Sequence, residues 1–213
     1  MEFEEFKHKI VKIKKMKLPG ESAQFKMAPK ERINELKKIA DVKKSAKKAG
    51  VLALFYPSVS KQTMLALILR KTYKGVHSAQ IGFPGGKFEA MDSSLRVTAL
   101  RETEEEIGVN QNKVIVLKKL TEVYIPPSNF FVQPFLGYTN KTPNFILQED
   151  EVEDLIEVPL KYFMNDSIKS FQNLSTSYAK NIEVPVFKLN NHRVWGATAM
   201  MLSEVREMLK QLL

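Results

Sequence analysis

Hydrophobic residues in the first part of the chain recur at two different spacings. In residues 2–17 and 30–48 they return every three or four positions, which predicts an amphipathic helix in each stretch. Residues 21–29 between them show no such repeat and are predicted to form a loop. An unbroken apolar run at residues 51–56 predicts a buried strand, and residues 64–70 are its predicted hairpin partner.

The rest of the chain alternates short apolar runs with turn residues. Further strands are predicted at residues 79–83, 114–120, 122–125, 131–138 and 152–158, and a last hairpin at 184–189 and 193–195. A helix capped by Asp92 or Ser93 is predicted to end near Ile107, and another covers residues 196–213. Residues 167–181 are polar and unpatterned, which indicates a flexible insertion. A mixed sheet with helices on its faces predicts an α/β sandwich.

Length and composition fit one globular domain. The chain has 213 residues, of which 44% are hydrophobic and 27% charged. We expect a single domain over residues 1–213, with a core at 51–213 and a basic helical elaboration at 1–50. No apolar run approaches the ~18–20 residues of a membrane span, and the acidic N-terminus is unlike a signal peptide. The absence of cysteine excludes disulfides and thiol catalysis and favours the cytoplasm.

The net charge of +9 is concentrated at the beginning of the chain. Residues 1–50 hold 15 Lys and Arg against 7 Asp and Glu. This excess either attracts a polyanion, such as a nucleotide or a nucleic acid, or simply forms solvated helix faces. The second interpretation is favoured, and nucleic-acid binding is not expected.

The chemistry of the chain is concentrated between Gly85 and Gly108. Two glycines, Gly85 and Gly86, precede the predicted helix, and four of the five residues from 102 to 106 are glutamates. At ~100° per residue, Glu102, Glu105 and Glu106 share one helical face, where their charges repel one another. A hard divalent cation removes that repulsion, because Mg²⁺ prefers carboxylate oxygens and phosphates. Arg101 lies four residues before Glu105 and is predicted to hold it by a charge-assisted hydrogen bond.

This stretch resembles the signature of the Nudix hydrolases. The matching residues are Gly86, Arg101, Glu102, Glu105, Glu106, Gly108 and Val109. The early acid is Asp92, one residue further from Arg101 than in the general pattern, and Thr103 replaces the usual aliphatic residue. The resemblance implies an α/β/α sandwich with a catalytic loop-helix-loop. It also implies a Mg²⁺ or Mn²⁺ cofactor on Glu102, Glu105 and Glu106.

Other segments resemble the coenzyme A pyrophosphatase branch of that family. Its longer spacing before the arginine is present here, and residues 78–86 resemble its motif before the signature, with Arg70 upstream and His77 as a variant position. Residues 194–199 resemble its C-terminal motif. The implied reaction is hydrolysis of coenzyme A to 3′,5′-ADP and 4′-phosphopantetheine. The alternatives are another nucleoside diphosphate derivative, such as ADP-ribose or NADH, or a non-catalytic nucleotide- or RNA-binding module.

Several of the remaining candidate residues have two possible interpretations. Glu105, Glu106 and a later acid, Glu151, are candidates for the general base, although Glu151 is equally interpreted as surface charge. Arg70, His77 and the Gly85-Gly86 backbone are expected to contact the substrate, and His77 is otherwise an ordinary loop residue. Trp195 is predicted to be a core residue. A weaker hypothesis assigns the 3′-phosphate of coenzyme A to Lys43, Lys44, Lys47 and Lys48. The apolar stripes of the terminal helices fit either a core or a homodimer interface.

Overall fold

A hairpin of two apolar strands forms the centre of the computed structural model, which describes residues 1–30, 33, 45–71, 80–174 and 182–213. β1 and β2 pair antiparallel, with Leu54 opposite Ala66, and most of their residues are buried. The strands of the large sheet are β1 (Lys47–Pro57), β2 (Thr63–Arg70), β3 (Ile81–Gly82), β4 (Gly85–Lys87), β5 (Val114–Lys119), β6 (Val123–Ile125), β7 (Phe130–Thr139) and β8 (Val152–Pro159). The predicted hairpin is therefore confirmed.

The large sheet is mixed, as predicted. β1 runs parallel to β7, with Gly50 opposite Gln133, whereas its other partners are antiparallel. β8 extends the sheet beyond β2, and β5 and β6 lie along β7. A separate sheet contains β9 (Lys169–Leu174), β10 (Ile182–Leu189) and β11 (His192–Val194).

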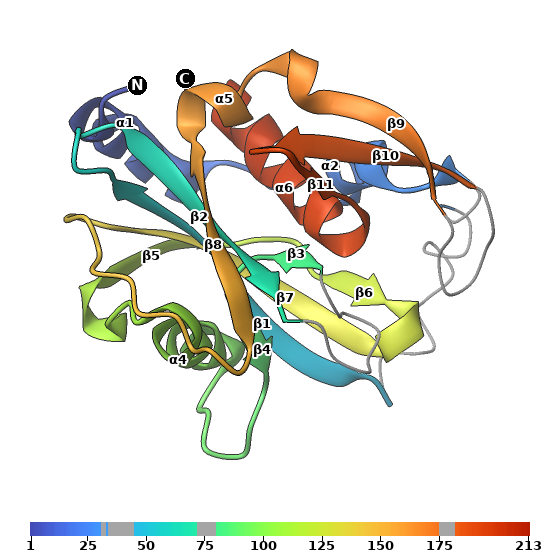
Figure 1. Cartoon of the computed structure of the whole chain (residues 1–213), viewed down its shortest axis with the longest axis horizontal. Helices are drawn as coiled ribbons and strands as arrows, with labels where there is room; N and C mark the ends of the chain where they lie inside the picture. Colours follow the sequence, from blue (N-terminus) through green and yellow to red (C-terminus); the bar gives the residue numbers. More distant parts are fainter. Residues whose placement is uncertain (31–32, 34–44, 72–79, 175–181) are drawn as a thin grey trace.

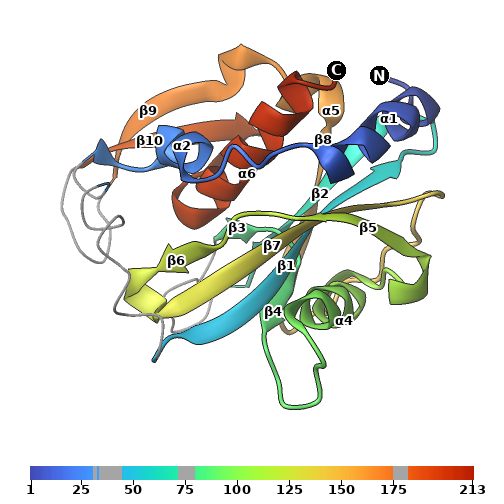
Figure 2. The ribbon, with the colours of Figure 1, turned by 180° about the vertical axis from the view of Figure 1, so that it is seen from behind.

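Helices cover both faces of the large sheet (Figures 1 and 2). α4 packs on one face, whereas α6 and the small sheet lie on the other. The helices are α1 (Phe3–Ile10), α2 (Glu21–Gln24), α4 (Leu95–Ile107), α5 (Leu160–Phe163) and α6 (Gly196–Lys210), with 3₁₀ turns η1 (Val11–Lys15), η2 (Phe25–Met27), η4 (Gln111–Lys113), η5 (Pro126–Ser128) and η6 (Asp166–Ile168). The predicted α/β/α class is confirmed. Within the described residues, no helix is long and apolar enough to span a membrane.

Several predicted elements differ from the structure. The predicted loop at residues 21–29 contains α2 and η2, whose Ala23 and Met27 are buried. The predicted helix at 30–48 falls mostly outside the described residues, and it cannot reach residue 48 because β1 begins at Lys47. The predicted flexible insertion begins with η6 and β9. β9 escaped the pattern because it is a polar strand with no fully buried residue.

The N-terminal stretch folds largely as its pattern predicts. Phe3, Phe6, Ile10 and Ile13 are all buried, although the helix tightens into a 3₁₀ turn after Ile10. These side chains pack into the same core as α6 and the small sheet. The beginning of the chain is thus part of the hydrophobic core of the sandwich.

Candidate functional site

The Gly85-Gly86 pair and the acidic helix meet where β1, β4 and α4 come together. The Gly85-Gly86 pair, for which no strand was predicted, begins the short strand β4 beside β1, with Gly86 opposite Gly50. A Cβ atom at Gly50 would stand 2.2 Å from the backbone oxygen of Leu95, so α4 rests directly on the backbone of β1. A Cβ at Gly86 would stand 2.3 Å from Glu102 Oε2. The two glycines therefore allow the helix and its carboxylates to approach the sheet.

Asp92 fastens the loop to the helix instead of capping it. The N-cap is Ser94, whose Oγ accepts a 3.3 Å hydrogen bond from the Val97 backbone NH, so the predicted caps at Asp92 and Ser93 were wrong. The Asp92 carboxylate accepts Arg101 Nε and Nη2, both at 3.0 Å, and Thr98 Oγ1 at 2.9 Å. These bonds hold the pKa of buried Asp92 well below its usual range. At its other end the helix stops at Gly108, in the left-handed region at φ 73°, as predicted.

The guanidinium group of Arg101 contacts three carboxylates. Besides Asp92, its Nη1 donates to Glu105 Oε2 at 2.9 Å, and its Nη2 lies 3.0 Å from Glu102 Oε1. The expected Arg101–Glu105 bond is therefore present. Glu105 itself is exposed, which leaves its carboxylate open to solvent on the far side from Arg101.

Glu106 is fully buried at the centre of the site. Its Oε2 accepts the Gly85 backbone NH at 2.7 Å. Its Oε1 lies 3.2 Å from Arg70 Nη1 but without the geometry of a hydrogen bond, so this buried oxygen has no hydrogen-bond partner among the described residues. The same Arg70 nitrogen donates to the Gly85 carbonyl at 3.3 Å. Arg70 at the end of β2 thus joins the glycine strand to the acidic helix.

The surroundings of Glu106 and Glu102 disfavour the ionised forms of their carboxyl groups. Burial raises the pKa of Glu106 to about 7, in spite of the favourable charge of Arg70 and the Gly85 NH. Burial also raises the pKa of Glu102, against the effect of Arg101. The charge of Glu151 acts in the same direction on both residues, so this exposed side chain lies close enough to contribute to the negative field.

Backbone hydrogen bonds of residues 146–151 connect Glu151 to the end of α4. The Gln148 NH donates to the Glu106 carbonyl at 3.0 Å, and the Ile146 NH donates to the Ile107 carbonyl at 3.2 Å. Gln148 then accepts the backbone NH of Glu151 at 3.1 Å. The last turn of α4 and Glu151 are therefore linked through one residue, which the sequence pattern did not indicate.

The donor set fits a divalent cation, although no metal site is already assembled. Among the described residues, no three His, Cys, Asp or Glu side chains are grouped as a metal site. Glu106 has a buried oxygen without a hydrogen-bond partner among the described residues, and burial raises the pKa of Glu102 and Glu106, with a smaller contribution from the negative field of neighbouring acids. A bound cation would offset both effects. Carboxylate oxygens in such a field are the ligands that Mg²⁺ and Mn²⁺ prefer.

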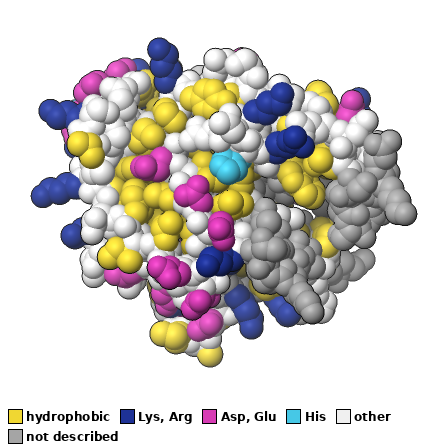
Figure 3. All heavy atoms as spheres, in the orientation of Figure 1, with side chains coloured by type: hydrophobic (Ala, Val, Ile, Leu, Met, Phe, Trp, Pro, Cys, Tyr) yellow, Lys and Arg dark blue, Asp and Glu magenta, His cyan; other side chains and the backbone are white. Residues whose placement is uncertain are grey.

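Other predicted residues fall outside this cluster. His77, Lys43 and Lys44 lie outside the described residues, whereas Lys47 and Lys48 are exposed at the start of β1. Trp195, predicted to be in the core, is instead half-buried just before α6, where it is one of the residues that line a hollow. Acidic side chains gather over the middle of the face in Figure 3, with Lys and Arg both beside them and at the edge.

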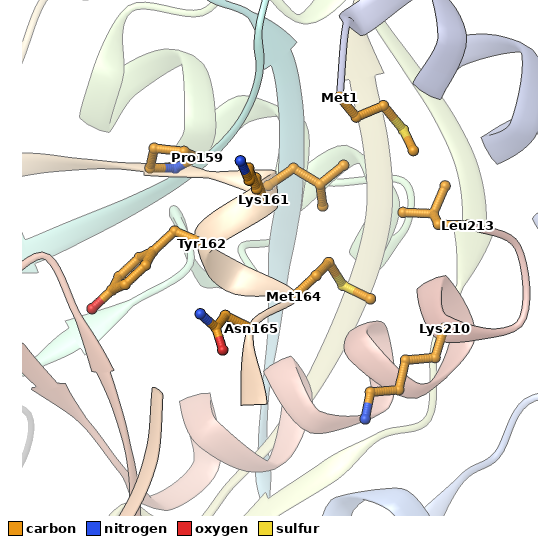
Figure 4. Close-up of a pocket in the computed structure, with 9 residues that line it drawn as sticks. Met1, Pro159, Lys161, Tyr162, Met164, Asn165, Lys210 and Leu213 are labelled. Carbon is orange, nitrogen blue, oxygen red and sulfur yellow. The ribbon is translucent and has the colours of Figure 1, made fainter. Parts of the chain in front are cut away.

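A larger hollow of about 760 Å³ lies between α5 and α6, away from the acidic helix. Figure 4 shows Lys161 of α5 and Lys210 of α6 on different sides of it. None of the described residues that line it is an aspartate or glutamate, so it offers no carboxylate side chain to a metal ion.

Comparison with known proteins agrees with this geometry. The family model described as NUDIX domain matches residues 46–173. The peroxisomal coenzyme A diphosphatase ndx-8 of Caenorhabditis elegans is 28% identical over 80% of this chain and 74% of its own length. A probable nudix hydrolase of Schizosaccharomyces pombe is 32% identical over 68% of this chain and 50% of its own length. The Nudix hydrolase NudL of Yersinia enterocolitica is 31% identical over 73% of this chain and 79% of its own length.

Solved structures agree on the fold. The Nudix hydrolase RenU of M. smegmatis superposes with a TM-score of 0.55 at 12% identity, covering 79% of this chain and 88% of that chain. An Ap4A hydrolase of C. elegans superposes with a TM-score of 0.51 at 15% identity, covering 78% and 98%. Because the family match spans more than half of the residues, and the Y. enterocolitica relative is 31% identical and covered over 79% of its length, this chain belongs to the Nudix family of hydrolases.

Proposed function

We propose that this Nudix hydrolase cleaves the diphosphate linkage of coenzyme A or its derivatives to 3′,5′-ADP and 4′-phosphopantetheine. The observation that carries the reaction type is the buried carboxylate of Glu106, which has an unpartnered oxygen beside Arg70 and the Gly85 backbone. The substrate is supported by the named C. elegans coenzyme A diphosphatase and by the resemblance of residues 78–86 and 194–199 to that branch. A cytoplasmic location and a homodimer stay predictions.

Nudix hydrolases generally need divalent metal ions, and Glu102, Glu105 and Glu106 are the residues that we expect to hold Mg²⁺ or Mn²⁺. When bound, such an ion neutralises the diphosphate charge and lowers the pKa of a coordinated water. Arg101, fixed by Asp92, keeps Glu105 and Glu102 in place. Arg70 and the Gly85-Gly86 backbone border the space beside Glu106 and are expected to orient the phosphates.

A carboxylate of the chain is expected to accept the proton of the attacking water. A water oxygen forms the new bond to phosphorus, the bridging P–O bond breaks, and a carboxylate accepts the proton of the water. Glu105, Glu106 and Glu151 are the candidate bases. Glu105 and Glu151 are exposed and near the site, whereas Glu106 is buried in it.

An assay with Mg²⁺ or Mn²⁺ on coenzyme A, with chromatographic separation of products, tests this function. Wild type should release 3′,5′-ADP, and Glu106→Gln should lower kcat by about 100-fold or more, because it removes a carboxylate from the reacting centre. The matched control is Glu104→Gln on the same helix, whose side chain only accepts a 3.3 Å bond from the Gln111 NH, and it should stay within about twofold.

The same assay separates the alternatives. Cleavage of ADP-ribose or NADH without cleavage of coenzyme A would keep the diphosphatase chemistry and reject the substrate. A pure, metal-loaded protein that leaves all three intact would reject the enzyme and favour a binding module.

A further inference from the structure

A second hollow lies beside the end of β2, the strand that carries Arg70. It has a volume of about 290 Å³, near the lower end of the ~300–1,000 Å³ typical of ligand pockets. One wall comes from the ends of β2 and β3, and the other from the β10–β11 hairpin and the residue that precedes α6. We call it the hairpin pocket, and its lining residues are Leu69, Gln80, Ile81, Asn191, His192, Arg193 and Trp195.

The hairpin pocket is one strand residue away from Arg70. The Arg70 NH donates to the Gln80 carbonyl at 3.1 Å, and Leu69 pairs with Ile81. Side chains alternate along a strand, so Leu69 faces the α6 side while Arg70 reaches α4 and Glu106 on the other side. Arg70 at the end of β2 therefore borders the space beside Glu106, and Gln80, which accepts its backbone NH, lines the hairpin pocket.

Two cross-element hydrogen bonds fix the walls of the pocket. Asn190 and Asn191 both have positive φ, 46° and 66°, as a tight two-residue hairpin turn requires. The Asn190 side-chain amide donates to the Glu157 carbonyl of β8 at 2.7 Å. Thr198 Oγ1 of α6 donates to the Ile81 carbonyl of β3 at 2.9 Å. The pocket walls are thus tied to the sheet before any ligand arrives.

The pocket presents side chains that are not used within the fold. Among the described residues, the side chains of His192, Arg193 and Trp195 have no hydrogen-bond, ion-pair or ring partner. An arginine fork matches the oxygens of a phosphate, and a half-buried indole offers a flat face on which a base can stack. A histidine beside them adds a further hydrogen-bonding nitrogen. One hollow therefore combines groups that suit the base and a phosphate of a single nucleotide.

We infer that the hairpin pocket holds the nucleoside end of the substrate, with Trp195 against the base and Arg193 against a phosphate carried on the ribose. This inference rests on the proposed function and deepens it, because it makes the ribose phosphate a determinant of specificity. It assigns the 3′-phosphate of coenzyme A to the β10–β11 hairpin in place of the lysines at the start of β1.

Binding of product-like nucleotides tests the pocket without catalysis. Trp195 is the only tryptophan of the chain, so its fluorescence reports directly on this site. Titrated into metal-free protein, 3′,5′-ADP should quench the emission and bind about tenfold or more tightly than 5′-AMP, which lacks the 3′-phosphate. Arg193→Gln should abolish this difference. Equal binding of the two nucleotides to wild type, or no response of Trp195 to either, would overturn the inference even if coenzyme A is cleaved.

Kinetics give a second, independent readout. Arg193→Gln should lower kcat/KM on coenzyme A about tenfold, mainly through KM, and leave dephospho-coenzyme A within about twofold. The matched control is Lys188→Gln, which removes one positive charge from the residue that pairs with Arg193 across the hairpin but does not line the pocket. An equal loss on both substrates would overturn the inference. It would also be overturned if Lys48→Gln, and not Arg193→Gln, removed the preference for coenzyme A over dephospho-coenzyme A. If wild type cleaves neither substrate, the proposed function fails and the fluorescence titration alone decides the pocket.

Discussion

The raised pKa of Glu106 predicts an unusual dependence of stability on pH in the metal-free protein. Its carboxyl is fully buried, and its pKa is raised from 4.5 to about 7. Below pH 4.5 the group is neutral in both the folded and the unfolded chain. Between pH 4.5 and 7 the unfolded chain ionises first, so this residue lowers the free energy of unfolding as pH rises. Above pH 7 the effect is constant.

The magnitude follows from the shift of about 2.5 pKa units between 4.5 and 7. At 1.36 kcal/mol per unit, ionisation of Glu106 costs the folded state about 3 kcal/mol above pH 7. Glu106→Gln removes the titration and keeps an acceptor for the Gly85 NH. The free energy of unfolding of the variant minus that of wild type should therefore rise by about 3 kcal/mol from pH 4.5 to 7.

Urea unfolding in the presence of a chelator, at several pH values between 4 and 8, measures this difference. Groups common to both proteins cancel, and a constant offset from the altered contact with Arg70 does not affect the slope. A difference that stays flat with pH would refute the idea that Glu106 resists ionisation. Repeating the series with Mn²⁺ should stabilise wild type at pH 7 more than the variant, because a cation on the carboxylate favours its charged form.

Other predictions concern the parts that hold the site together. Asp92→Asn should destabilise the fold by about 2–3 kcal/mol and lower kcat, because Arg101 loses its buried anionic partner; thermal unfolding and steady-state assays measure the two effects. Gly50→Ala should cost about 2 kcal/mol or more in denaturant unfolding, since its Cβ would meet the backbone of α4. Gly86→Ala should leave the fold comparatively stable but lower kcat about tenfold or more and weaken Mn²⁺ binding, since the Glu102 side chain must move away. Equal stability losses for the two glycine variants would contradict this distinction.

The elements that sequence predicted well are those whose pattern is local. A capping region, a run of helix-forming residues and Gly108 predict α4. Two apolar runs around a turn predict the β1–β2 hairpin. The acidic face and its contact with Arg101 could also be predicted from the sequence, because side chains four residues apart are neighbours on any helix.

The elements that were missed depend on distant partners. β4 is a strand of glycines, and only its pairing with β1 at Gly50 makes it one. β9 is mostly polar, has no fully buried residue, and pairs along its length with β10. Asp92 was taken for a cap because nothing local shows that it accepts two bonds from Arg101. Trp195 was predicted to be a core anchor between the last hairpin and the last helix, whereas it is half-buried and lines a hollow.

The parallel pairing of β1 with β7 has a consequence for how the protein is made. Lys47 pairs with Phe130 and Phe55 with Tyr138, so the central pair is complete only when the second of two strands more than 70 residues apart has been synthesised. The glycine strand and the acidic helix, at residues 85–107, are encoded between them. On the ribosome these residues emerge before β7, and long-range pairing of this kind is slow. The residues of the acidic helix therefore leave the ribosome before β7 exists, and the central strand pair beneath them can be completed only after residue 139 has left the exit tunnel.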